Sequence, residues 1–521
     1  MPSVIRRFLV FNPAPGRWKF ALRAGICMSV PVLVGWLCGD TGAGLIAVIG
    51  GFTSLYGSGR PYRNRAGYLA GVAVFLAAAV ALGDWAAAIP WLGLVTITLI
   101  AMLAALVCHA LTVGPPGAYM FVLGCAAGTA TANAHLPPWH IGALVLAGGA
   151  FSWLVHLVGA LWGLRRPEHM AVQAARAAVD RYLQTRADAD RHQAARALHQ
   201  AWTTLVVFQP ARVRPDGAVA RLRMENLRLH RAFAAAVHAV DASTDGPDLA
   251  DVTEPARDVR LPLGRPGTIA LLRRALTPGS ESWRLAGLVG IAVALAGLAA
   301  LLLVSDHTYW AMAAAVLMLH QGLNWARTVA RGIERLVGTL IGLGLAAAIL
   351  SWQPQGWWLV ALIALLQFTI EMFVVRNYAV AVVFITPLAL TIASGGRPVP
   401  DLGQYLLARG LDTLIGCAVA LLVYWLALRR RHPRSLEATI AATDDAIEAT
   451  EVHLRAQEVT SAPALAARRD LQVHALAMLD AYQAAIGGSP NQRAQAERLW
   501  PTVAATEQRA FATLAACWQQ G

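Results

Sequence analysis

Charged residues are scarce in this chain of 521 residues: 14% are Asp, Glu, Lys or Arg, whereas 57% are hydrophobic. With a mean hydropathy of +0.51, the composition excludes a soluble globular protein of this size. The few charges gather in short blocks between long apolar segments, because ionisable side chains are costly in hydrocarbon. The composition therefore predicts an all-α polytopic membrane protein.

The sequence also lacks the motifs of several protein classes. Its six cysteines form no CxxC pair and no Cys/His group with metal-ligand spacing, so no metal site is predicted. It has no Walker lysine motif, which argues against ATP-driven transport, and no GxSxG or HExxH motif that would suggest an enzyme. We therefore expect neither an enzyme nor a cofactor.

The formal net charge of +13 alone would suggest nucleic acid as a partner. The positive charge lies mainly beside the apolar segments, however, where anionic lipid headgroups explain it better. The lipid bilayer is therefore the expected partner, and no nucleic acid is expected.

The apolar segments of near membrane length fall into two blocks of six. The first block, 20–164, has segments at about 20–38, 42–57, 66–83, 89–109, 117–133 and 141–163. The second block, 283–428, has segments at about 283–304, 308–323, 333–350, 357–374, 378–394 and 404–428. Residues 1–19 precede the first block as an N-terminal segment.

Arginines between these segments give the expected orientation. Arg60, Arg63 and Arg65 follow the second segment, whereas the connectors after the first, third and fifth segments have no Lys or Arg. Arg397, in an outer loop of the second block, is an exception. By the positive-inside rule, the N- and C-termini are predicted to be cytoplasmic.

Two further segments, 165–282 and 429–521, show the spacing of amphipathic helices and follow inside loops. Both are predicted to be cytoplasmic helical domains. The spacing leaves open whether the C-terminal segment forms its own bundle or packs on the middle one.

The two membrane blocks superimpose with a shift of about 266 residues, which places Asp40 on Asp306 and Gly148 near Gly416. Both blocks have six segments and a cytoplasmic start. The sequence therefore predicts two parallel six-helix transmembrane repeats with helical cytoplasmic domains.

Five motifs follow one another in the second block. They are Tyr309-Trp310 with the run to Arg327-Thr328, Glu334-Arg335-Leu336-Val337-Gly338-Thr339, Arg376-Asn377-Tyr378, Phe384-Ile385-Thr386-Pro387 and Leu411-Asp412-Thr413-Leu414-Ile415-Gly416. Together they resemble the fusaric acid resistance (FUSC-type) proteins, over about 306–428. That family includes bacterial aromatic acid exporters and is distantly similar to plant malate transporters. The resemblance implies proton-driven export of aromatic carboxylates.

Three acids are candidates for proton coupling. Glu371 lies near the inner end of an apolar segment, and its structural alternative is an ion pair with Arg376 or with an arginine of the neighbouring hairpin. Glu334 starts an apolar segment, with a helix-cap role as the alternative. Asp412 shares a helix face with Arg409, either as a buried pair or as a carboxylate that a substrate displaces.

Arginines and aromatic residues are the candidates for substrate binding. Arg327, Arg331 and Arg335 share a similar helix face and could form an entry site for an anion, although inside loops contain arginines regardless. Tyr309 and Trp310 could stack on an aromatic substrate or belong to an aromatic belt at the membrane surface. The full set of predicted binding residues is Arg327, Arg331, Arg335, Arg376, Arg409, Tyr309, Trp310 and Tyr378.

The function that these residues favour is an inner-membrane, proton-driven efflux transporter of aromatic or other small organic acids. An organic-anion channel and a non-transporting membrane scaffold with cytoplasmic interaction domains are the alternatives. The expected ligands are a small organic anion and protons, while a homodimer and a periplasmic adaptor protein are left open as partners.

Overall fold

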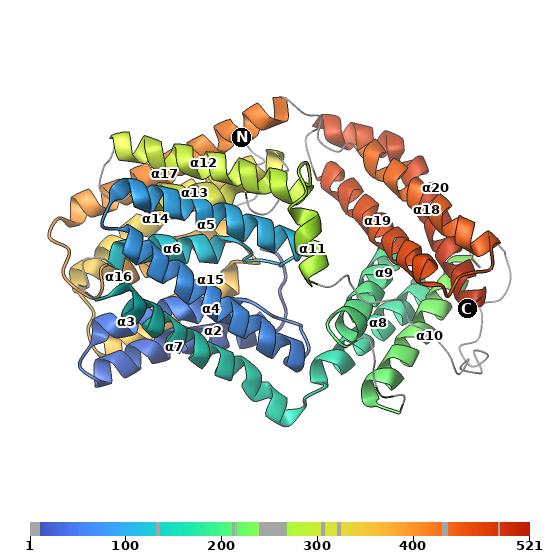
Figure 1. The fold of residues 1–521 in the computed structure, drawn as a ribbon, viewed down its shortest axis with the longest axis horizontal. Helices are drawn as coiled ribbons and strands as arrows, with labels where there is room; N and C mark the ends of the chain where they lie inside the picture. The colour runs from blue at the N-terminus through green and yellow to red at the C-terminus, as the bar shows by residue number, and fades with distance from the viewer. Residues whose placement is uncertain are drawn as a thin grey trace. The chain divides into compact units, whose positions relative to one another are not determined.

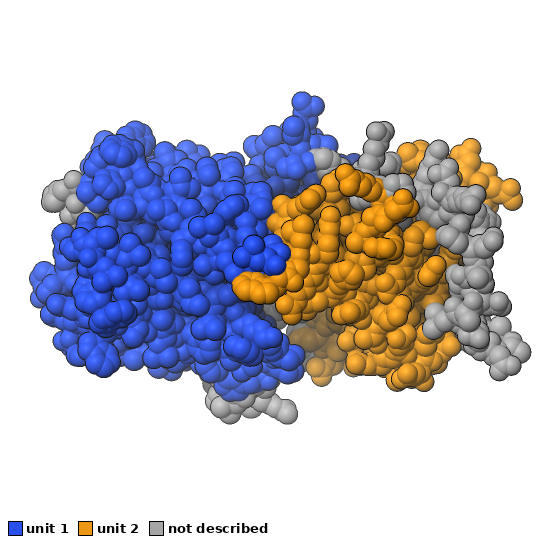
Figure 2. Space-filling model, turned by 90° about the horizontal axis from the view of Figure 1, so that it is seen from below, with its two compact units in different colours: residues 1–58, 65–161, 267–431 blue, residues 59–64, 162–266, 432–521 orange. Residues whose placement is uncertain are grey.

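In the computed structural model, the described residues are 11–131, 136–210, 214, 216–238, 268–303, 308–319, 325–429, 436–487 and 490–520. Their regular secondary structure is helical, without a strand. Figure 2 colours the two compact units into which the chain divides: unit 1 is 1–58, 65–161 and 267–431, and unit 2 is 59–64, 162–266 and 432–521. The all-helical prediction is confirmed for this part of the chain.

Unit 1 holds both apolar blocks (Figure 1). The helices of the first block are α2 (Arg17–Leu37), α3 (Thr41–Gly50), η1 (Gly51–Leu55), α4 (Tyr62–Ala86), α5 (Pro90–Ala110), α6 (Tyr119–Thr131), α7 (Pro138–Leu157) and η3 (Val158–Trp162). Those of the second are α12 (Glu281–Leu303), α13 (Tyr309–Leu319), α14 (Trp325–Trp352), α15 (Trp357–Phe373), α16 (Tyr378–Ala393) and α17 (Leu402–Arg429). The short helix α11 (Thr268–Ala275) precedes the second block and also belongs to unit 1, although the sequence placed it in the middle segment 165–282.

Seven of the described helices are long and apolar enough to cross a membrane, and five shorter apolar helices lie between them. In chain order, these helices correspond to the apolar segments that the sequence predicts. A membrane-spanning helix satisfies its backbone hydrogen bonds internally, which is why apolar runs of this length become helices. The prediction of a multi-pass membrane protein is therefore confirmed.

Local signals set where several of these helices begin. Asp40 accepts a hydrogen bond from the backbone N–H of Ala43 at 2.8 Å and caps α3. Asn377 caps α16 in the same way, by accepting from the N–H of Val380 at 3.2 Å. Pro90 opens α5, at a position where a missing N–H costs nothing.

Glycines allow the backbones of neighbouring helices to touch. A Cβ atom on Gly148 of α7 would lie 1.9 Å from the carbonyl oxygen of Ala47 on α3. A Cβ atom on Gly416 of α17 would lie 2.2 Å from the carbonyl oxygen of Ala311 on α13. Helix packing in membranes depends on such small residues, because lipid supplies little hydrophobic force between helices.

The helix α14 begins earlier than the sequence suggests. It starts at Trp325 instead of about residue 333, so Arg331, Glu334 and Arg335 all lie inside the helix. The predicted cap role of Glu334 is therefore wrong, because this residue lies more than two turns from the helix start. The side chain of Arg327, and also Asp306, lie outside the described part of the chain.

Unit 2 joins residues from the middle and the end of the sequence (Figure 1). Its helices are α8 (Arg166–Thr185), α9 (Asp188–Trp202), η4 (Thr203–Val207), α10 (Ala218–His238), α18 (Leu436–Arg455), α19 (Ala462–Ile486) and α20 (Pro490–Gln520). One buried apolar cluster contains Val179, Leu198 and Phe233 together with Leu471 and Phe511. The C-terminal segment thus packs on the middle one and shares its core.

Candidate anion-binding site

Two buried arginines lie in the second apolar block of unit 1. Arg335 is on α14 and Arg409 is on α17, and these two helices pack against each other. Each arginine is only 2% exposed. Burying a guanidinium is costly unless hydrogen bonds and opposite charge compensate it, so a pair of them marks a special site.

Aromatic side chains surround these two arginines. The guanidinium carbon of Arg409 lies 3.8 Å from the centre of the Trp310 ring, a cation–π contact. Arg335 lies close to Tyr378 of α16 and to Tyr119, the first residue of α6. The site therefore combines positive charge with flat apolar surface, which is the chemistry that a small aromatic anion requires. We call it the arginine cluster, and its members are Arg335, Arg409, Asp412, Tyr309, Trp310, Tyr378, Tyr119 and Cys417.

Several polar atoms of the arginine cluster have no hydrogen-bond partner among the described residues. They are Nε and Nη1 of Arg335, Nε of Arg409, Nε1 of Trp310 and both carboxylate oxygens of Asp412. Buried polar groups in proteins are nearly always hydrogen-bonded, so these N–H donors are available to an anion or to water. Asp412 is 0% exposed and lies near Arg409, but it accepts no hydrogen bond from that residue. The directly hydrogen-bonded Arg409–Asp412 pair that the sequence left open does not form.

Glu371 belongs to a different group of charges. Arg17 at the start of α2 donates from Nη2 to the Oε2 atom of Glu371 at 2.6 Å and from Nε to its carbonyl oxygen at 2.9 Å. Gln367 donates to the other carboxylate oxygen at 3.1 Å. The partner is thus neither Arg376 nor an arginine of the hairpin, the two that the sequence suggested.

Arg376 also turns toward the N-terminal segment. Its Nη2 atom donates to the carbonyl oxygen of Ala14 at 3.3 Å, and its own carbonyl accepts from Asn12 at 3.0 Å. Arg331 lies near Tyr378, at the edge of the arginine cluster. Of the predicted residues, the structure therefore brings together Arg335, Arg409, Asp412, Tyr309, Trp310 and Tyr378, and leaves Glu371 and Arg376 apart from them.

Sequence reasoning missed Arg17, Tyr119 and Cys417. Arg17 lies in the short N-terminal segment, where a basic residue is expected for topology alone. Tyr119 comes from the other apolar block, and no local pattern links it to residue 335 or 409. Cys417 lies five residues beyond Asp412 on α17, and a lone buried cysteine in an apolar segment gives no signal of a site. No group of three His, Cys, Asp or Glu side chains suited to a metal occurs in the described ranges.

Comparison with known proteins agrees with the motifs of the second block. Residues 291–423 match the family model described as fusaric acid resistance protein-like. The chain is also similar to the uncharacterized membrane protein YvaC of Bacillus subtilis (strain 168), at 29% identity over 575 aligned positions that cover 99% of this chain and 88% of the relative. No solved structure matches the chain. The protein is thus a multi-pass membrane protein, and its residues 291–423 are similar to the fusaric acid resistance protein-like family, as the motifs predict.

Proposed function

We propose that this protein is an inner-membrane, proton-driven efflux transporter of aromatic or other small organic acids, with both termini in the cytoplasm. The observation that carries the proposal is the pair of buried guanidiniums, Arg335 and Arg409, beside the rings of Trp310, Tyr119 and Tyr378. A guanidinium matches a carboxylate with two parallel N–H donors, and a neighbouring ring favours a flat apolar body. Arg331 of α14 lies near Tyr378 and adds positive charge at the edge of this site, while Arg327 stays a binding residue predicted from the sequence.

The transporter core would consist of two parallel six-helix repeats. The packing of the helices supports this repeat, because α2 packs on α15 while its counterpart α12 packs on α5. Likewise, α3 packs on α7 and α13 packs on α17, with Gly148 and Gly416 at corresponding close contacts. Repeats of this kind place substrate sites at their interface, and Tyr119 of the first block reaches the arginine cluster of the second.

In this proposal the three candidate acids have different roles, beginning with Asp412. Protonation of Asp412 would remove a negative charge beside Arg409 and so strengthen anion binding. When a proton and an anion favour each other's binding, the transporter carries both across the membrane in the same direction. Proton-driven export instead requires protons to move inward while the anion moves outward. Asp412 therefore sets the affinity for the anion and does not drive its export. Glu334 lies between Arg331 and Arg335 in the sequence of α14. Its carboxylate would reduce the positive charge that an entering anion meets.

Glu371 fits the coupling role better. Its ion pair with Arg17 joins α15 of the second block to α2 of the first, and its hydrogen-bond partners Arg17 and Gln367 are not members of the arginine cluster. Protonation of Glu371 would weaken this pair and change how the two blocks are held together, without a direct effect on the substrate. In this proposal Arg376 holds the N-terminal segment in place beside the pair.

Reconstituted transport tests the proposal. Proteoliposomes loaded with labelled benzoate should release it in response to an opposing proton gradient. Arg409→Gln should abolish release, whereas Glu371→Gln should bind benzoate normally but lose the response to the gradient. Gradient-driven release by Glu371→Gln at the wild-type rate would exclude the coupling role.

The same vesicles distinguish a transporter from a channel. A benzoate current that reverses at the benzoate Nernst potential and ignores the proton gradient would indicate an organic-anion channel. Wild-type protein that neither moves nor binds any acid of a broad panel would indicate a membrane scaffold. The mass of the purified assembly tests for a homodimer, and co-purification with a periplasmic adaptor protein tests for that partner.

A further inference from the structure

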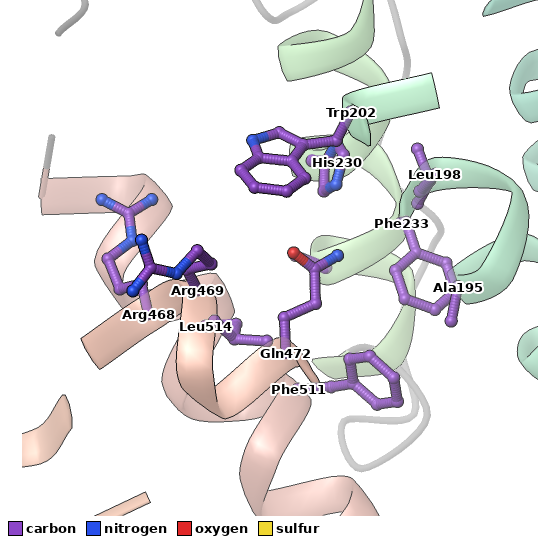
Figure 3. A pocket seen from close by; sticks show the side chains of 11 residues that line it. Ala195, Leu198, Trp202, His230, Phe233, Arg468, Arg469, Gln472, Phe511 and Leu514 are labelled. Carbon is purple, nitrogen blue, oxygen red and sulfur yellow. The ribbon is translucent and has the colours of Figure 1, made fainter. Parts of the chain in front are cut away.

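Unit 2 contains a pocket whose lining comes from four helices (Figure 3). The apolar side is formed by Leu198 and Trp202 of α9, Phe233 of α10, and Phe511 and Leu514 of α20. The polar side is formed by Arg468, Arg469 and Gln472 of α19. This pocket lies in the fold of unit 2 alone and does not involve the arginine cluster of unit 1.

The aromatic side of the pocket is held in place by other rings. Trp202 stacks on His199 with ring centres 5.8 Å apart and an interplanar angle of 25°. Phe233 meets Phe511 edge to face, at 5.4 Å and 89°. Trp202 and Phe511 are each 7% exposed, so their positions do not depend on a ligand. A preformed apolar wall lowers the entropy cost of binding a flat ring.

The polar side of the pocket carries positive charge. Arg468 is 5% exposed, and its Nη1 atom donates to the carbonyl oxygen of Val459 at 3.2 Å. Arg231 adds a further positive charge near Arg468, while Asp470 partly neutralises Arg469 through a 3.0 Å ion pair. In Figure 3, the two guanidiniums lie across the pocket from Phe233, and the amide of Gln472 points into the space between Trp202 and Phe511.

His230 also lines the pocket but adds no charge near neutral pH. Its Nδ1 atom donates to the carbonyl oxygen of Asn226 at 2.8 Å. Burial lowers the pKa of His230 to about 4, although the hydrogen bond to Asn226 acts in the opposite direction. The positive charge of the pocket therefore comes from arginines and persists over the physiological pH range.

We propose that unit 2 binds a small organic anion in this pocket, with a planar ring against Trp202 and Phe511 and a carboxylate at Arg468 and Arg469. Gln472 would donate or accept a hydrogen bond at the ring edge. Because the lining comes from residues 195–234 and 468–514, the bound anion would tie the middle segment of the sequence to the C-terminal one and stabilise unit 2.

Equilibrium dialysis of labelled benzoate against the full-length protein in detergent tests this site. The assay uses the Arg409→Gln chain, so that binding in unit 1 does not contribute. Arg469→Gln and Trp202→Leu, each added to that chain, should weaken benzoate binding at least tenfold. Arg455→Gln is the matched control, because Arg455 lies on α18 of the same unit with 76% of its side chain exposed. Benzoate should bind this control as it binds the parent.

The choice of competitor separates the contributions of charge and ring. Benzamide has the ring without the charge, and acetate has the charge without the ring, so both should compete at least tenfold less well than unlabelled benzoate. An Arg409→Gln chain that binds no benzoate would overturn the proposal, as would binding that survives both Arg469→Gln and Trp202→Leu. Benzamide competing as well as benzoate would overturn the assignment of an anion. The transport assay of Arg409→Gln is separate, so failure here leaves the proposed transport function untouched.

Discussion

Arg17 and Glu371 form an ion pair at 2.6 Å although 354 positions of sequence separate them. The pair ties the start of α2 to the end of α15. In the proposed repeat, the matching helices α12 and α5 have their own polar contact, between Ser282 and His109 at 2.8 Å. The Ser282–His109 contact joins a hydroxyl to an imidazole, whereas the Arg17–Glu371 contact joins a guanidinium to a carboxylate.

The two partners of this ion pair should not contribute equally to stability. Glu371 is 5% exposed, whereas 23% of the Arg17 side chain is exposed and can reach solvent when its partner is removed. Breaking a buried pair costs about 3–5 kcal/mol when a buried charge is left behind. We expect Arg17→Gln to lower the melting temperature in detergent more than Glu371→Gln does, and the double variant to recover part of the loss. Arg284→Gln, at an exposed position of α12, is the control. Equal and additive losses for the two single variants would argue against the pair.

The contact between Arg409 and Trp310 predicts that charge alone is insufficient in the arginine cluster. A lysine at 409 keeps the charge but lacks the flat guanidinium that lies 3.8 Å from the indole ring and the paired N–H donors. Arg409→Lys should therefore reduce benzoate transport at least tenfold, close to the effect of Arg409→Gln. Initial rates in proteoliposomes measure this, and Trp310→Phe should retain more activity than Trp310→Leu. Wild-type rates for Arg409→Lys would show that only a positive charge is needed.

Glycine substitutions should separate close helix contacts from open positions. A methyl group on Gly416 would collide with the carbonyl oxygen of Ala311, so Gly416→Ala should destabilise the protein by about 1–3 kcal/mol or more. Gly344 of α14 has nothing within 4 Å of a built Cβ atom, so Gly344→Ala should be neutral or slightly stabilising. Thermal unfolding in detergent of the two variants measures the difference. Equal melting temperatures for the two variants would contradict the close contact between Gly416 and Ala311.

Unit 2 should lose stability in mild acid because of His230. The folded pKa of this residue is about 4, lowered mainly by burial, whereas an unfolded histidine titrates near 6.5. The stability from the neutral ring is complete above pH 6.5 and decreases as the pH falls toward 4, by up to about 3 kcal/mol. Burial also lowers the pKa of His199, so this residue should add to the loss of stability in acid.

Denaturant unfolding of unit 2 at several pH values measures this effect, with a fluorescent label on the exposed Arg455→Cys position of a Cys38→Ser chain as reporter. His230→Gln removes the titrating group and should flatten the profile between pH 6.5 and 4. His453→Gln on α18 of the same unit should leave the slope unchanged. If His230→Gln keeps the full slope, other groups cause the acid sensitivity.

Hydropathy and helical spacing predicted the helices themselves well. The apolar segments at 20–38 and 89–109, for example, correspond to α2 and α5 within a few residues. The error at α14 has a clear cause, since arginines at 327 and 331 mark a connector by composition, whereas helices can extend beyond the apolar run. The amphipathic spacing of segments 165–282 and 429–521 predicted helices in both. The spacing within one segment does not show which other segment its apolar face packs against.

The sequence by itself determined which segments are helices and which side chains are unusual in them, because hydropathy and the helix period depend on neighbouring residues only. It marked Arg335 and Arg409 as candidates, but in two separate groups. Only the tertiary structure decided that these two share one site with Tyr119, and that Glu371 pairs with Arg17. Such contacts join residues hundreds of positions apart, and they follow from how closely small residues such as Gly416 let the helices approach.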